Sequence, residues 1–220
     1  MDLPTFIFRV LAGFFGGASG TVVLLGIFLT TKSVLSPLGS EQPITEYVSP
    51  IFVFILLVMF FLSSTVANIV STLLLGWADK SRYKNLKFTV YQVLIVSLLI
   101  FVLMAFVYFG TSLLNPTLLP YIIGLHVIIS AQVSALILEI ASNNKHALIG
   151  VYGVTFSLFL SFGILLVLST LFSGNTAILL FALLPVVWGA TALMGGLVTA
   201  VYEFLVKTYE RDFLAIEEKI

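Results

Sequence analysis

The sequence predicts an all-α, polytopic membrane protein with six transmembrane helices, cytoplasmic N- and C-termini and an amphipathic helical extension at the C-terminus. Three observations lead to this fold class. Hydrophobic residues make up 60% of the 220 residues and charged residues only 9%, with a mean hydropathy of +1.18; ordinary globular proteins contain about 25% charged residues. Several uninterrupted apolar runs exceed the roughly 20 residues that cross a bilayer. Lysine and arginine are also distributed unevenly between the connecting segments.

Proline, glycine and charged residues divide the chain into six apolar segments. Pro4, Pro50 and Pro120 stand where helices are expected to begin, because proline is tolerated in the first helical turn. The expected helices cover about residues 4–29, 50–77, 88–114, 120–140, 148–172 and 177–206. Pro185 lies inside the last helix and predicts a kink there.

The basic residues predict the orientation. With six crossings and residues 79–87 in the cytoplasm, nine of the ten lysines and arginines lie inside, and Lys32 alone lies outside. Such an excess of basic residues is typical of cytoplasmic segments, and five or seven crossings would remove it. We therefore expect residues 1–206 to form the transmembrane domain and residues 207–220 to form a cytoplasmic amphipathic tail.

Small residues gather on one face of the first helix and of the last. At 100° per residue, the four glycines of the first helix fall within about 100° of one another: Gly13, Gly16, Gly17 and Gly20. The last helix repeats this spacing with Ala192, Gly195, Gly196 and Thr199. Helices in lipid associate through close backbone packing at such faces. We expect the two faces to pack against each other, and a homodimer through either face is the alternative.

Aligning the midpoints of these two faces brings Arg9 and Glu203 to a similar depth, each seven to eight residues inward of its midpoint. We predict an ion pair between them at the cytoplasmic interface, which avoids the cost of an isolated charge in hydrocarbon. Alternatively, each side chain extends separately to the interface. Glu139, near the inner end of the fourth helix, is expected to be an interface anchor.

Two stripes of polar residues cross the expected membrane interior. One face of the second helix carries Ser64, Asn68 and Ser71, together with Thr65 and Thr72. One face of the fourth helix carries His126, Ser130 and Ser134. Polar groups in lipid must face protein or water. The stripes therefore either line a solute path, with Asn68 and His126 as its specific contacts, or join helices through hydrogen bonds worth about 1 kcal/mol or less each.

Several kinds of chemistry find no support in the residues. The chain has no cysteine, no cluster of metal ligands and no lysine at mid-membrane depth for a retinal Schiff base, so we expect no catalytic residue, metal or cofactor. The net charge of zero gives no sign of a nucleic-acid partner. Gly17-Ala-Ser-Gly20 resembles the Gly-x-Ser-Gly nucleophile signature of the rhomboid intramembrane proteases. In that family the serine follows three helices and the last helix supplies the histidine, whereas here the serine is in the first helix. An intramembrane enzyme with a Ser19–His126 catalytic dyad is therefore a third hypothesis for function, after the two given below.

The tail continues the pattern of an amphipathic helix. Its apolar residues recur at intervals of three and four: Tyr202, Leu205, Tyr209, Phe213, Ile216 and Ile220. From Glu203 onward it carries three basic and five acidic residues, which disfavours binding to anionic lipid. The tail is expected either to fold back against the basic residues 79–87 or to dock a partner.

These patterns give two expectations for function. The first is an integral, multi-pass membrane transport protein, of the channel or facilitator type, for a small neutral or weakly charged solute. Its path would run between the second and fourth helices. The second is a non-catalytic subunit or scaffold that binds a membrane protein partner, or a second copy, through its small-residue faces and tail. In both cases the lipid bilayer is an expected partner of the chain.

Overall fold

The computed structural model describes residues 3–33, 35, 49–78, 85–112, 115–142, 147–171 and 176–217. Over these residues the chain is all-helical, with six helices long and apolar enough to cross a membrane. They are α1 (Leu3–Thr30), α2 (Pro50–Ala78), α3 (Leu86–Ser112), α4 (Leu119–Ser142), α5 (Ala147–Leu171) and α6 (Thr176–Glu217), with a 3-10 turn, η2 (Pro116–Leu118), before α4. The predicted all-helical class with six helices of membrane-spanning length is confirmed, and the expected bounds of these spans agree within a few residues. α6 continues beyond its expected span into the predicted helical extension.

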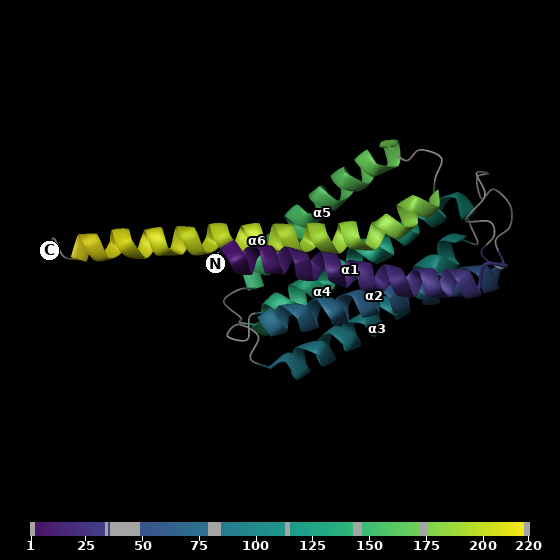
Figure 1. Ribbon diagram of the computed structural model, residues 1–220, viewed down its shortest axis with the longest axis horizontal. Helices are drawn as coiled ribbons and strands as arrows, with labels where there is room; N and C mark the ends of the chain where they lie inside the picture. Colours follow the sequence, from purple (N-terminus) through teal and green to yellow (C-terminus); the bar gives the residue numbers. More distant parts are fainter. Residues whose placement is uncertain are drawn as a thin grey trace.

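The helices form a ring in chain order that the first and last helices close. Each helix packs against the next, and α1 packs along both α2 and α6 (Figure 1). In addition, α4 contacts α2 and α6 across the ring. Within the described part of the chain, α1 and α4 make no backbone contact with each other. The interior between these two helices is therefore spanned by side chains alone.

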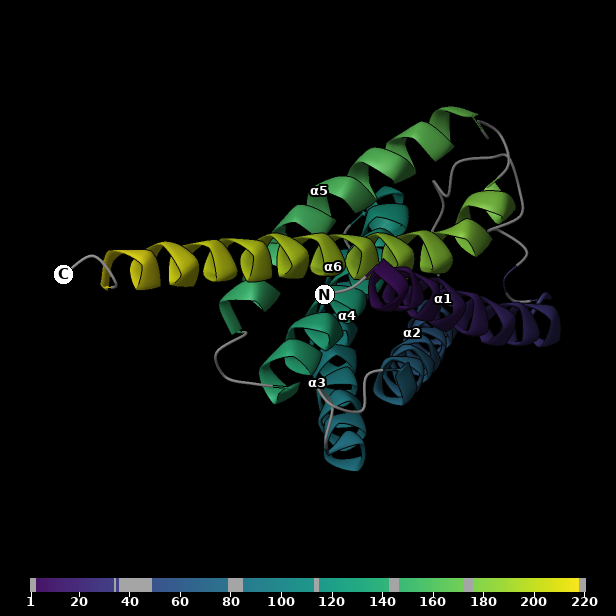
Figure 2. The same cartoon turned by 60° about the vertical axis from the view of Figure 1, so that its left-hand side comes forward.

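Burial separates inner from outer helices. Leu56, Phe60 and Val127 belong to one core formed mainly by α2 and α4, which are the most buried spans. α3 and α5 expose large apolar side chains such as Phe106 and Phe159, as expected for surfaces that face acyl chains. α5 also diverges from α6 toward its C-terminal end (Figure 2).

The glycine face of α1 lies against two helices at once. A Cβ at Gly13 would lie 2.6 Å from the carbonyl oxygen of Trp188, and one at Gly17 would lie 2.5 Å from that of Leu184, so this side touches the backbone of α6. A Cβ at Gly16 would lie 2.8 Å from the carbonyl oxygen of Ala67, and Gly20 similarly faces Ser63, so the other side touches α2. The predicted close contact of the first and last helices is present, and the contact with α2 was not predicted.

The register of α1 on α6 differs from the predicted one. Gly13 faces Ala192, as expected for paired small faces, but Gly17 faces Leu184 and Pro185. Gly195 and Gly196 instead lie beside the side chains of Arg9 and Phe6. α1 thus packs about nine residues, or roughly 14 Å, nearer to the start of α6 than an alignment of the two faces implies.

Pro185 explains part of this register. Proline has no N–H, so the carbonyl oxygen of Phe181, four residues earlier, loses its helical donor. The hydroxyl of Thr21 on α1 lies 3.2 Å from that oxygen and donates to it. An unsatisfied carbonyl is costly where no water is present, so this hydrogen bond favours α1 lying beside the proline turn of α6.

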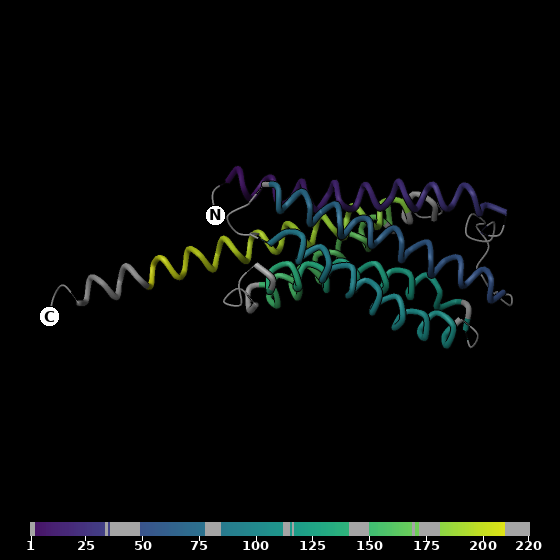
Figure 3. Tube along the Cα trace, turned by 90° about the horizontal axis from the view of Figure 1, so that it is seen from below, coloured from purple at the N-terminus to yellow at the C-terminus, as the bar shows by residue number. Residues whose placement is uncertain are grey.

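α1 begins, and α6 leaves the ring, at the same end of the bundle (Figure 3). Exposed aromatic residues gather near this end: Trp77, Tyr91, Tyr152 and Tyr202. Such residues mark the boundary between membrane and water. Assignment of this end to the cytoplasm stays a prediction from the basic residues.

The helical extension at the C-terminus is present. α6 has 42 residues, about 63 Å of helix, and projects beyond the other helices (Figure 1). Tyr202, Leu205 and Tyr209 are exposed on it. The side chains of Phe213, Ile216 and Ile220, and residues 79–84 of the basic segment, lie outside the described residues.

Replacing Gly17 by alanine should destabilise the fold. The new methyl group would lie within 2.6 Å of two backbone atoms of α6, at Leu184 and Pro185, and only separation of the two helices can relieve that contact. We expect a loss of about 1–3 kcal/mol, measured by SDS-induced unfolding of the purified protein. Gly26→Ala is the matched control, because a Cβ there meets nothing within 4 Å. Equal effects of the two changes would contradict the packing described here.

Candidate functional site: a polar cavity inside the bundle

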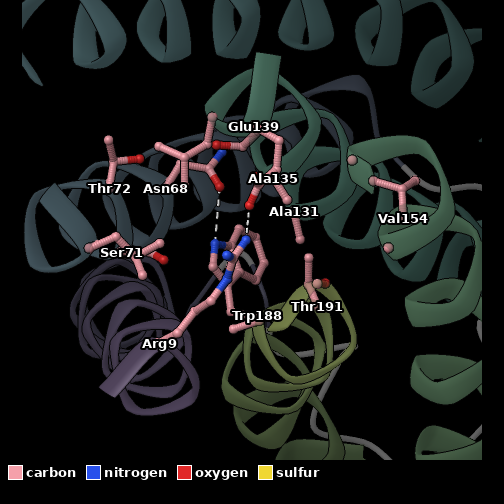
Figure 4. Close-up of a pocket in the computed structure, with 17 residues that line it drawn as sticks. Arg9, Asn68, Ser71, Thr72, Ala131, Ala135, Glu139, Val154, Trp188 and Thr191 are labelled. Atoms are coloured by element: carbon pink, nitrogen blue, oxygen red, sulfur yellow. Dashed lines mark hydrogen bonds and ion pairs between the residues drawn. The ribbon is translucent and has the colours of Figure 1, made fainter. Parts of the chain in front are cut away.

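A cavity of about 50 Å³ lies between α1, α2, α4, α5 and α6 (Figure 4). A single water needs roughly 10–15 Å³ on this scale, so the cavity has room for a few water molecules. Arg9 is near the start of α1, Leu75 near the end of α2 and Gly150 near the start of α5. The cavity therefore lies in the half of the bundle where the chain begins. Its polar lining consists of Arg9, Asn68, Ser71, Thr72, Ser134, Glu139 and Thr191.

The charged residues of the cavity form an ion pair between α1 and α4. The guanidinium of Arg9 contacts the carboxylate of Glu139, and the two residues are only 8% and 3% exposed. The backbones of these helices do not meet, so the side chains connect them across the interior. Both ions leave water, and their attraction offsets a desolvation cost of several kcal/mol each.

This pair corrects two predictions from the sequence. Arg9 was expected to pair with Glu203, and Glu139 was expected to anchor at the membrane surface. Because of the shifted register, Arg9 lies at the level of Gly195 and Gly196. Glu203 is seven residues further along α6, about 10 Å away along the helix axis. Glu139 instead turns inward, where Arg9 reaches it (Figure 4).

Glycines on α5 and α6 make room for the ion pair. A Cβ at Gly195 would lie 3.4 Å from a terminal nitrogen of Arg9, and one at Gly150 would lie 3.2 Å from the Cβ of Glu139. Gly153 allows the backbones of α5 and α6 to meet, since its Cβ would lie 3.2 Å from the Cα of Gly195. The small face predicted on α6 thus accommodates Arg9 and α5 more than it accommodates the glycines of α1.

Asn68 connects three helices beside the cavity. Its side-chain oxygen accepts a hydrogen bond from the indole N–H of Trp188 on α6 at 3.0 Å. Its side-chain nitrogen donates to the carbonyl oxygen of Ser130 on α4 at 3.3 Å. Asn68 therefore joins helices through hydrogen bonds, which was one of the two interpretations of the polar stripes. It also lines the cavity.

A second amide, Gln132, joins α4 to α5 and α6. It donates to the hydroxyl of Thr191 at 3.1 Å and accepts from the hydroxyl of Ser157 at 2.6 Å. The polar stripes did not single out Gln132, because it lies on a different face of α4 from the stripe that contains His126. Its signal was its amide alone, which in a membrane helix requires a partner.

The predicted path residues divide into two groups. Asn68, Ser71 and Ser134 line the cavity. His126 does not: it is fully buried, and its Nδ1 lies 3.4 Å from the hydroxyl oxygen of Tyr108 on α3. The hydroxyl of Ser64 is also buried outside the cavity lining and, within the described chain, has no hydrogen-bond partner. Ser130 contributes its carbonyl to Asn68.

Two further features bear on a catalytic dyad. The hydroxyl of Ser19 donates to the carbonyl oxygen of Gly16 in its own helix at 2.7 Å. Nδ1 of His126 lies against Tyr108, and Nε2 has no hydrogen-bond partner among the described residues. The Ser19–His126 dyad considered from the sequence is therefore not formed. Among the residues that the structure describes, no group of three or more His, Cys, Asp or Glu could hold a metal ion.

No family model, curated protein or solved structure matches this chain.

Removing one member of the Arg9–Glu139 pair should cost more than removing both. Arg9→Met removes the guanidinium that contacts the buried carboxylate of Glu139, and we expect a loss of about 3–5 kcal/mol in SDS-induced unfolding. The double variant Arg9→Met/Glu139→Leu should recover most of this loss. Glu203→Gln is the control for the register, with an expected effect of about 1 kcal/mol or less. If the Glu203 variant matched Arg9→Met and the Glu139 double variant gave no recovery, the assignment of the pair would be wrong.

Proposed function

We propose that this protein is a membrane transport protein, of the channel or facilitator type, for a small neutral or weakly charged solute. The observation that carries the proposal is the cavity between α1 and α4. There, side chains from four helices turn hydroxyl, amide and charged groups toward a shared interior space instead of toward lipid. Concave sites with a few convergent polar groups are the usual form of small-molecule binding sites.

The path proposed for the solute is shifted from the one expected from the sequence. It still passes between α2 and α4, but its specific contacts are Asn68, Arg9 and Glu139, without His126. The seam between α1 and α6 forms one wall. Because Asn68 and Gln132 already hold α2, α4, α5 and α6 together through hydrogen bonds, the wall of the path keeps its shape around the cavity.

A second candidate function is a non-catalytic subunit of a membrane protein complex. The observation in its favour is the projecting part of α6. Beyond the level at which α1 begins, Val201, Leu205 and Tyr209 are each more than half exposed and share one helical face. A partner or a second copy would cover this face. This function predicts that loss of residues 208–220 abolishes assembly with the partner, whereas the transport function predicts that solute flux survives it.

Filling the cavity should stop transport. We expect proteoliposomes to show solute flux above that of protein-free vesicles in stopped-flow light scattering. Ser134→Leu should reduce that flux to background, because leucine occupies the space that the serine leaves open beside the cavity. His126→Phe should keep the flux, since His126 lies outside the cavity lining; size-exclusion chromatography checks that both variants fold. Flux lost in the His126 variant and kept in the Ser134 variant would refute this path.

A further inference from the structure

The charges in the cavity cancel. Arg9 and Glu139 are the charged residues in its lining, and they face each other in one ion pair. The remaining polar contributors are neutral: an amide at Asn68 and the hydroxyls of Ser71, Thr72, Ser134 and Thr191. A monovalent ion that entered would lose hydration and meet no uncompensated opposite charge. The cost of placing such a charge inside a membrane therefore stays large.

The ion pair nevertheless presents a fixed direction to a neutral solute. Arg9 offers only donors, from α1, and Glu139 in its ionised form offers only acceptors, from α4. A solute that carries an acceptor oxygen and a donor N–H on neighbouring positions matches this arrangement of donors at Arg9 and acceptors at Glu139. Such a solute can lie along the pair with its oxygen toward Arg9 and its N–H toward Glu139, and hydrogen bonds to charged partners are the stronger ones.

The size of the cavity sets the size of the solute. Space for a few water molecules fits a planar solute of about three to five non-hydrogen atoms. Trp188, Leu75 and Leu138 are the largest apolar side chains of the lining. Small hydrogen-bonding molecules with one flat polar group are therefore favoured over sugars and other larger polyols.

From charge, direction and size together, we propose that the cavity selects small neutral amides, meaning ureas and short primary amides, and excludes charged molecules of the same shape. This inference rests on the proposed transport function and names its substrate class. The Arg9–Glu139 pair recognises the amide group, and the hydroxyl of Thr72, on the wall contributed by α2, adds a further hydrogen-bonding group.

Two pairs of solutes of equal shape test the proposal. Acetamide is compared with acetate, and urea with guanidinium, in proteoliposomes that contain the full chain. Binding of the same solutes to the purified protein is measured independently by saturation-transfer NMR. We expect acetamide and urea to permeate at least about tenfold faster than their charged counterparts, the factor that corresponds to about 1.4 kcal/mol, and to give saturation transfer.

A matched pair of variants connects this selectivity to the cavity. Thr72→Val removes a hydroxyl from the lining without changing the side-chain shape, and should lower amide flux and binding about three- to tenfold. Thr65→Val makes the same change about two turns earlier on α2, where the hydroxyl is buried outside the lining. This variant should leave amide flux and binding unchanged. Both variants retain the Arg9–Glu139 pair.

The outcomes separate the two proposals. If amides bind and respond to Thr72→Val but nothing permeates, the transport function fails and the ligand class stands. If glycerol or the charged solutes permeate as fast as the amides, the ligand class fails and the transport function stands. If nothing permeates and acetamide does not bind, both are overturned.

Discussion

The fold depends on how closely the backbone of α1 approaches its neighbours. In a bilayer, two apolar helices gain little by leaving lipid for each other, so association relies on packing and on interhelical hydrogen bonds. Gly13 and Gly17 bring α1 onto the carbonyl groups of α6, and Gly16 and Gly20 bring it onto those of α2. One bare face thus closes the ring of six helices on two sides. The hydrogen bond from Thr21 to Phe181, beside Pro185, holds the contact at one level.

The position of Arg9 is a consequence of that contact. With α1 held against α6, the second turn of α1 faces the interior, and the guanidinium of Arg9 passes beside Gly195 toward Glu139 on α4. If α1 lay further out, the same side chain would face acyl chains or the membrane surface. The gap between α1 and α4 that the ion pair spans is also the space that forms the cavity. Helix packing and the candidate site therefore have one physical origin.

Much of the architecture could be predicted from the sequence, because hydropathy and helix-terminating residues are local signals. The bounds of the helices, the close approach of α1 and α6, and the inward positions of Asn68 and Ser134 are of this kind. The register of α1 on α6 could not be predicted, because a strip of glycines specifies close approach without specifying which backbone it meets. One contribution to the register is the carbonyl oxygen of Phe181, which Pro185 leaves without a helical donor and to which Thr21 donates. From the wrong register followed the wrong partner for Arg9. The position of His126 against Tyr108, outside the cavity, depends on the rotation of α4, which a stripe of polar residues constrains only loosely.

Disulfide trapping tests the register of α1 on α6 most directly. A Cβ at Gly189 would lie 4.0 Å from the Cβ of Phe14, within the range of about 3.5–4.5 Å that a disulfide needs, and the chain has no cysteine of its own. The double variant Phe14→Cys/Gly189→Cys should form an intramolecular disulfide under mild oxidation, detected by mass spectrometry. Phe14→Cys/Val198→Cys, which matches an alignment of the two small-residue faces, should stay reduced. Trapping of the second pair and not the first would contradict the packing that brings Arg9 to Glu139.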